Sequence, residues 1–294
     1  MQSSLVKTAF LCNISQKWKQ VVPEVLGNIK RIFTEEEALF FVDRKNPVSS
    51  EEHLKKILES GFERIVVVGG DGTLNRTVNF LQRNQFLDQV TLGIIPFGTC
   101  NDFAKTIGLP KGDAFFALES LEKNKIKRVK VAQVNRHYFL NNSGFGRSNP
   151  GKRRKGPIAD INQMKPIRTK IIWENGLLQD EFFMMICANA PYFSDGLHFS
   201  KESNPYDERL EFFFVRKMSK VRLLAKLFFG KRGRPLEKSP IDESILRIDT
   251  TKITVQTNAP IWVMTDGELV PELSAIREAV FQIAGTCNFV VPEI

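Results

Sequence analysis

The first third of the chain alternates short apolar runs with helical patterns, as β-α-β units do. Residues 65–68 form a β-branched run suited to a strand buried on both faces, and residues 91–95 form a second. Between these runs, Leu74, Val78 and Leu81 recur at helical spacing. The pattern predicts a mainly parallel α/β sheet. Further elements expected here are strands over 6–11 and 38–42, a helix over 49–60, and a short helix ending near 108–110.

Strand-like segments dominate after about residue 128. They cover residues 129–134, 138–140, 170–173, 181–188, 210–215, 245–248, 253–256 and 261–264, with turn residues at 174–176 and 265–267 among others. Many short strands separated by turns are typical of a β-sandwich. Because 294 residues exceed the usual size of one hydrophobic core, we expect two domains. These are an α/β domain over 1–128 and a β-sandwich over 129–282, with segment 283–294 returning to the first.

Charge and composition narrow the classes of function. Lys and Arg total 42 against 33 Asp and Glu, and the net charge of +9 favours an anionic partner, although a basic solubilising surface is as good an explanation.

The longest apolar run, 182–188, is far short of the roughly 20 residues that span a bilayer, and no signal peptide is recognisable. We expect a soluble, cytoplasmic protein. Scattered cysteines predict reduced thiols, and the histidine spacing and absent Gly-x-Ser-x-Gly argue against zinc chemistry and serine hydrolysis.

A glycine-rich turn, Val-Gly-Gly-Asp-Gly-Thr-Leu-Asn, joins the first buried strand to its helix. Gly69, Gly70 and Gly72 let the backbone approach a phosphate closely, and the helix N-terminus favours anions. Thr73 can cap the helix or bind a phosphate oxygen. Asp71 would repel a phosphate, so it suits a metal ion or a proton better. The alternative is an ordinary tight turn without function.

The second buried strand also runs into a helix, through Ile-Pro-Phe-Gly-Thr-Cys-Asn-Asp. Gly98 permits the turn, and Thr99 and Asn101 are favourable residues at a helix start. Asp102 is expected in the same crevice as the carboxylate of the first turn, because the carboxyl ends of neighbouring parallel strands share one edge. Helix capping alone is the alternative. Neither turn matches a P-loop, and the third glycine of a dinucleotide fingerprint is absent.

A third signal lies far downstream, where a predicted strand ends in Thr-Asp-Gly-Glu. By itself this is a hairpin turn. Together with the first two turns, Asp266 and Glu268 supply carboxylates from the second domain to an inter-domain cleft. Phosphoryl transfer needs carboxylates that hold a metal and position the attacking hydroxyl.

In this order and spacing, GGDGTLN at 69–75, PFGTCNDFA at 96–104 and TDGE at 265–268 resemble the diacylglycerol kinase catalytic-domain family. This family contains soluble bacterial lipid kinases and is related to sphingosine and ceramide kinases and, more distantly, to NAD kinase. Segments 138–146, 188–196 and 206–215 resemble further family motifs. The resemblance implies a Rossmann-like N-terminal domain, a C-terminal β-sandwich and an active site in the cleft between them. It also implies Mg²⁺-dependent transfer of the ATP γ-phosphate to a lipid hydroxyl.

The resemblance assigns roles to individual residues. Asp71, Asp266 and Glu268 fall on catalytic and metal-associated carboxylates. The candidate metal ligands are Asp102 and Asp207. The candidate nucleotide-binding residues are Asn13, Gly69, Gly70, Gly72, Thr73, Asn75, Gly98, Thr99 and Asn101.

Several positions depart from the family pattern. The first loop reads Asn-Ile-Ser-Gln from Asn13 instead of Asn-Pro-x-(Ser/Ala)-Gly, Arg76 stands where Glu is common, and residues 194–196 replace a triple glycine. Lys130 replaces the Asp of a Val-Asp-x-Gly strand, and Glu208 replaces the Gly of Asp-Asp-Gly. In bacterial relatives that Asp belongs to an acidic network around a structural Mg²⁺. Lys130 either replaces the charge of the metal or indicates that the network is absent.

Two basic segments bear on the partners. Residues 219–229 predict an amphipathic helix within the basic stretch 220–234, and residues 147–155 predict a basic loop. Such segments favour transient peripheral association with an anionic membrane surface, although packing on the sandwich is a slightly better explanation of the helix. The sequence lacks the interleaved aromatic and basic residues of nucleic-acid recognition motifs, so we expect no nucleic-acid partner. A homodimer stays open.

The sequence thus predicts an ATP- and Mg²⁺-dependent lipid kinase. Diacylglycerol, phosphatidylglycerol, a sphingoid base or an isoprenoid alcohol could each supply the acceptor hydroxyl. One alternative is an NAD kinase-like enzyme, against which the Pro-x-Gly-Thr-x-Asn-Asp segment argues. The other is a catalytically inactive homologue that binds lipid or nucleotide as a regulator, an alternative motivated by Lys130 and the altered loops.

Overall fold

The computed structural model describes residues 6–13, 22–33, 38–42, 48–110, 112–146, 165–193, 197–198, 202–219 and 244–293. The chain forms two compact units. Unit 1 is Met1–Val129 with Thr286–Ile294, and unit 2 is Lys130–Gly285. The predicted basic loop, most of the predicted amphipathic helix and residues 194–196 lie outside the described residues. No helix in the described ranges is long and apolar enough to span a membrane.

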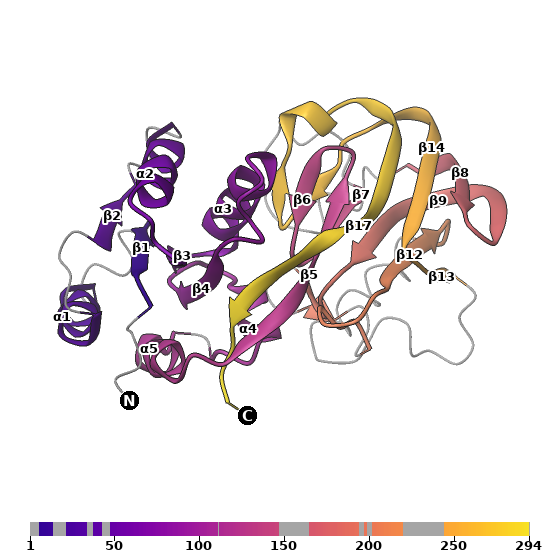
Figure 1. Cartoon of the computed structure of the whole chain (residues 1–294). Coiled ribbons are helices and arrows are strands. Elements are labelled where there is room, and N and C mark those ends of the chain that lie inside the picture. The colour runs from indigo at the N-terminus through magenta and orange to yellow at the C-terminus, as the bar shows by residue number, and fades with distance from the viewer. Residues whose placement is uncertain are drawn as a thin grey trace. The chain divides into compact units, whose positions relative to one another are not determined.

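Unit 1 is built on a parallel sheet in the order β17-β4-β3-β1-β2 (Figure 1). Its strands are β1 (Thr8–Cys12), β2 (Leu39–Phe41), β3 (Arg64–Gly69), β4 (Thr91–Pro96) and the last residues of β17 (Ile276–Val290). Every residue of β1 and β3 is buried, as the continuous apolar runs predict for strands covered on both faces.

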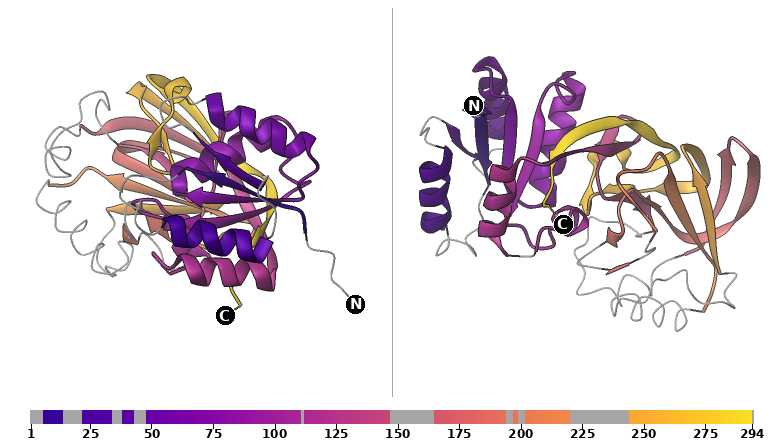
Figure 2. Two further views of the ribbon diagram at one scale, coloured as in Figure 1. Left: turned by 90° about the vertical axis from the view of Figure 1, so that its left-hand side faces the viewer. Right: turned by 60° about the horizontal axis from the view of Figure 1, so that its bottom comes forward.

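In the described part of unit 1, five helices accompany this sheet. They are α1 (Val22–Phe33), α2 (Val48–Glu59), α3 (Asp71–Arg83), α4 (Asp102–Thr106) and α5 (Ala114–Lys123). α2 and α3 pack together on one face of the sheet, and α1 and α5 on the other (Figures 1 and 2). α3 buries Leu74, Val78 and Leu81, the three residues that define its apolar stripe. The parallel strands therefore end where α3 and α4 begin.

Unit 2 is rich in antiparallel strands. β9 (Gly176–Ala188) pairs with β7 (Asn142–Phe145), β8 (Ile167–Trp173) and β12 (Leu210–Arg216). β14 (Lys252–Ile261) pairs with β8 and with β17. The remaining elements are β5 (Ile126–Val134), β6 (His137–Phe139), β10 (Tyr192–Phe193), β11 (Leu197–His198), β13 (Ile245–Thr250), β15 (Met264–Thr265), β16 (Glu268–Leu269) and the short helix η3 (Pro271–Leu273). A phenylalanine-rich core that includes Phe182, Phe212, Phe214 and Phe281 holds them together.

The prediction of an α/β part followed by a β-rich part is confirmed. The sequence pattern missed α1, α5, β7 and most of β17. β17 escaped because charged Arg277 and Glu278 interrupt its start and Gly285, at φ 150°, interrupts its end. The segment predicted as one strand over 261–264 is instead the end of β14 and the start of β15.

Candidate functional site

The turn between β3 and α3 is the first candidate region of unit 1. Gly70 is the residue before α3, and because glycine has no side chain, no side-chain hydrogen bond caps the helix at this position. Its carbonyl accepts hydrogen bonds from the backbone N–H groups of Thr73 and Leu74, at 3.0 and 3.1 Å. α3 has 13 residues, so its dipole directs partial positive charge at this turn. A helix start of this kind suits a phosphate group.

Asn13 and Thr73 meet beside this turn. Asn13 follows β1 directly and is buried, and its Nδ2 donates to Thr73 Oγ1 at 2.8 Å. Gly69 lies against the same pair, because a Cβ on Gly69 would come within 3.2 Å of Thr73 Oγ1. Three predicted nucleotide-binding residues are thus brought together at the end of two neighbouring strands.

Asn101 closes the turn between β4 and α4. The residue is fully buried and adopts a left-handed conformation at φ 54°. Its Oδ1 accepts from the Gly98 N–H at 2.8 Å, and its Nδ2 donates to the carbonyls of Gly98 and Pro96 at 3.1 and 3.4 Å. The side chain of Asn101 therefore shapes the turn. Thr99 is exposed in the same turn, where a ligand can reach it.

The two turns pack backbone against backbone. A Cβ on Gly70 would lie 2.7 Å from Gly98 Cα, and a Cβ on Gly98 would lie 2.5 Å from both Gly70 Cα and Asn101 Oδ1. The Phe97 N–H also donates to the Gly69 carbonyl at 2.7 Å. From the sequence, the glycines of the first turn are expected to allow a close approach of phosphate. At Gly70 and Gly98 the structure adds a different requirement, which is the mutual contact of the two turns.

Asp71 joins the two turns electrostatically. Its Oδ2 accepts from the backbone N–H of Asp102 and its Oδ1 from that of Phe103, both at 3.0 Å. These are the first amides of α4, whose preceding residue, Asn101, provides no side-chain cap. A carboxylate thus caps the helix in place of the missing local cap. Asp102 itself directs its carboxylate to Lys105 Nζ at 3.3 Å.

The other candidate acids lie on the β15–β16 hairpin of unit 2. Asp266 and Gly267 form its turn at φ 47° and 81°, and the predicted hairpin is present. Asp266 Oδ1 accepts from the N–H groups of Asn141 and Asn142 at 2.8 and 3.1 Å, and Oδ2 accepts from that of Leu140 at 3.0 Å. Glu268, by contrast, is exposed. The hairpin holds one fixed carboxylate and one accessible carboxylate.

Asn189 lies in the family-like segment 188–196, although the sequence assigned it no role, and it supports the backbone at residues 140–141 that binds Asp266. Its side chain is 1% exposed, and its Nδ2 donates to the carbonyls of Leu140 and Lys130 at 2.7 and 2.9 Å. Its backbone N–H donates to the Asn141 carbonyl at 2.8 Å. Two signals in the sequence point to Asn189: its place in the family-like segment 188–196, and its position directly after the apolar run 182–188, where a buried amide needs partners.

Three of the four cysteines, Cys12, Cys187 and Cys287, are buried free thiols. Burial raises the pKa of the Cys12 thiol and of the Cys287 thiol to about 12. Burial likewise raises the pKa of Cys187 well above its ordinary value. A thiol that stays protonated is a poor nucleophile and a poor metal ligand. Cysteine chemistry is therefore not a function of these three positions.

Comparison with known proteins points in one direction. A model of the diacylglycerol kinase catalytic domain matches residues 14–134. The chain is 25% identical over 222 residues to the diacylglycerol kinase of Bacillus subtilis (strain 168), covering 70% of this chain and 71% of that protein. It is 30% identical over 224 residues to a putative lipid kinase of Staphylococcus carnosus (strain TM300), covering 71% of each. The crystal structure of a diacylglycerol kinase from Bacillus anthracis str. Sterne matches with a TM-score of 0.76 at 22% identity, over 99% of this chain and 98% of that one.

The contact between the two turns predicts a stability effect. Gly98→Ala should lower the free energy of unfolding by about 1–3 kcal/mol, because the new methyl group would overlap the backbone of Gly70. Gly27→Ala is the matched control. Gly27 is exposed in α1, and its Cβ would meet no atom within 4 Å, so alanine should stabilise the helix by roughly 0.5–1 kcal/mol. Chemical denaturation measures both, and equal stability of the two variants would contradict the contact.

Proposed function

Because the chain belongs to the diacylglycerol kinase catalytic-domain family, we propose that it transfers the γ-phosphate of ATP to a lipid hydroxyl group in a Mg²⁺-dependent reaction. The observation that carries the proposal is the start of α3, where a glycine turn, a long helix dipole and the Asn13–Thr73 pair converge. This arrangement suits the phosphates of a nucleotide.

On this proposal, the phosphates of ATP bind at the start of α3. Gly72 leaves its backbone partly accessible, and the Thr73 hydroxyl, oriented by Asn13, donates to a phosphate oxygen. Thr99 approaches the nucleotide from the second turn, where it is exposed. Binding of this kind uses neutral donors and the helix dipole, so it does not depend on a P-loop lysine.

Asp71 acts in this proposal as a positioning residue. Its carboxylate accepts hydrogen bonds from two backbone N–H groups of α4, and these contacts hold the two turns in register. A shift of about 1 Å in such a frame is enough to disturb phosphoryl transfer, because the reaction depends mainly on the positions of the groups. The spacing of the two turns therefore depends on the Asp71 side chain.

Asp266 and Glu268 have different roles in the proposal. We assign to Asp266, whose carboxylate is fixed by three amides, the role of orienting the lipid hydroxyl and accepting its proton. Glu268 is the accessible carboxylate and holds Mg²⁺ together with phosphate oxygens.

The donor chemistry of this hairpin fits Mg²⁺. Mg²⁺ is usually held by one or two carboxylates plus substrate phosphates, so a complete protein cage is not required. Among the described residues, no group of three or more His, Cys, Asp or Glu could hold a metal ion. When bound, the metal offsets the negative charge of the transferred phosphate. Asp102 suits this role less, because Lys105 already neutralises its carboxylate.

The lipid acceptor is inferred from relatives. The names of the similar proteins are diacylglycerol kinase and putative lipid kinase, which makes diacylglycerol the first acceptor to test. The net charge of +9 supports attraction to an anionic membrane surface. A site between the two domains, peripheral membrane association and a homodimer stay predictions.

The proposal is tested with purified protein, radiolabelled ATP and Mg²⁺ on detergent micelles that contain diacylglycerol, phosphatidylglycerol, sphingosine or an isoprenoid alcohol. We expect a labelled lipid phosphate from at least one of these. ATP binding by calorimetry without product from any lipid would favour the regulatory alternative. Formation of NADP from NAD and ATP, without a lipid product, would favour the NAD kinase alternative.

Asp71 provides a test of nucleotide binding with a matched control. Asp71→Asn replaces one carboxylate oxygen by an amide nitrogen and removes one of the two α4 bonds, so the affinity for ATP should fall at least about tenfold. In the control, Asp113 caps α5 in the same unit by accepting from the Phe116 N–H at 2.9 Å. Asp113→Asn should cost similar stability, about 1 kcal/mol, and leave ATP affinity unchanged in calorimetry. Equal affinity in both variants would count against the role of Asp71.

The hairpin acids provide a kinetic test. Asp266→Asn should lower kcat about 10²–10⁴-fold, because it removes the proton acceptor. Glu268→Gln should instead raise the Mg²⁺ concentration needed for half-maximal rate. Glu174→Gln, an exposed substitution in the β8–β9 turn, is the control and should leave both values unchanged. If Asp266→Asn keeps full kcat while folded by circular dichroism, the assigned role is wrong.

A further inference from the structure

Lys130 on β5 is a buried lysine whose ammonium group is surrounded by oxygen atoms. The residue is 2% exposed. Its Nζ donates to Asp207 Oδ1 at 2.6 Å, to the Asn204 carbonyl at 3.2 Å and to the Arg209 carbonyl. An ammonium group has three hydrogens to donate, and three oxygens accept them. The site is therefore fully satisfied by protein groups.

The oxygens come from segment 202–209, an irregular stretch that leads into β12. The Lys130 backbone N–H fastens the same segment by donating to the Pro205 carbonyl at 2.7 Å. Carbonyl groups that converge without a strand or helix need another partner, because buried polar groups are costly when unpaired. Lys130 supplies that partner from β5.

One carboxylate with two backbone carbonyls is a donor set that hard divalent cations also use. The residues present do not fit such a metal. Lys130 Nζ already occupies the point where the oxygens converge, and its single positive charge balances the single negative charge of Asp207. A divalent ion placed among the same oxygens would lie within a few ångströms of the ammonium and be repelled. The expectation that Asp207 is a metal ligand therefore disagrees with these contacts.

A reactive lysine is the other chemical role for a buried ammonium. Nucleophilic lysines act through a free lone pair on the deprotonated amine. All three hydrogens of Lys130 are engaged with oxygen atoms, one of them an ionisable carboxylate. The contacts thus favour an ammonium group with a structural role.

We infer that Lys130 is an internal cation that holds segment 204–209 in place of a bound divalent metal. The loop consequently folds without metal. This inference is independent of the proposed kinase reaction, because its test measures stability in the absence of nucleotide. Any Mg²⁺ that accompanies ATP during phosphate transfer is a separate ion.

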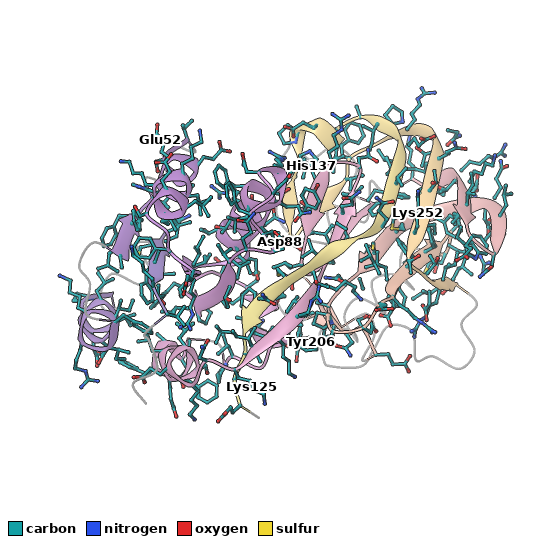
Figure 3. All side chains as sticks on the ribbon, in the orientation of Figure 1. Glu52, Asp88, Lys125, His137, Tyr206 and Lys252 are labelled. Carbon is teal, nitrogen blue, oxygen red and sulfur yellow. The ribbon has the colours of Figure 1, made fainter. Side chains whose placement is uncertain are left out.

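The first experiment measures the thermal midpoint Tm in EDTA and in millimolar Mg²⁺. The unmodified protein should show the same Tm, within about 1 °C, under both conditions. The Lys130→Asp variant should have a Tm in EDTA that is lower by roughly 10 °C. Mg²⁺ should raise this Tm by several degrees, because a second carboxylate then faces the oxygen cage formed by Asn204, Asp207 and Arg209. Lys252→Asp, an equal charge change at the exposed start of β14, should show neither effect (Figure 3). A folded Lys130→Asp protein that ignores Mg²⁺ and Ca²⁺ would overturn the inference.

A second variant covers the case in which Lys130→Asp fails to fold. Asp207 is 41% exposed at its side chain, so Asp207→Asn should fold with a lowered Tm. The unmodified protein and Asp207→Asn should carry equal, substoichiometric metal by elemental analysis after dialysis. A Mg²⁺-induced rise in Tm that Asp207→Asn abolishes, or one equivalent of metal that this substitution releases, would show a metal at the cage and overturn the inference.

Discussion

The candidate nucleotide site depends on the direct backbone contact between Gly70 and Gly98. A side chain at either position would push the two turns apart. Their closeness allows the Phe97 N–H to reach the Gly69 carbonyl and Asp71 to reach the first amides of α4. The start of α3 is thereby fixed relative to the next strand. Two glycines thus determine where the helix dipole and the Thr73 hydroxyl can act.

Acidic residues organise backbone in both units. Asp71 accepts two amides of α4, and Asp266 accepts three amides from residues 140–142. Each carboxylate connects two segments that lie far apart in the sequence. Such carboxylates are preorganised, because their orientation is set by the fold before any ligand arrives. Side chains with a proposed role in the reaction therefore also hold the fold together, and a loss of activity on their replacement must be separated from a loss of structure.

Local patterns predicted much of the fold and the location of the candidate residues, but not what those residues touch. The β-branched run at 65–68 and the Asp-Gly turn at 266 were sufficient, because strand burial and hairpin geometry are encoded within a few residues. The partners of Asp71 and Lys130 lie 31 and 77 positions away, and no periodicity reports such distances. The prediction of β17 failed for a related reason. Its 15 residues are divided between the two units, so its apolar pattern does not follow one face.

The cage around Lys130 has a consequence for how the fold is assembled in a living cell. A tethered ion has an effective concentration set by the chain itself, whereas a captured ion competes with every other chelator in its surroundings. The free-energy cost is the dehydration of one ammonium group, and it arises once, when the chain folds. A newly made chain can therefore complete this loop at any level of free magnesium, and starvation for the ion leaves its architecture untouched.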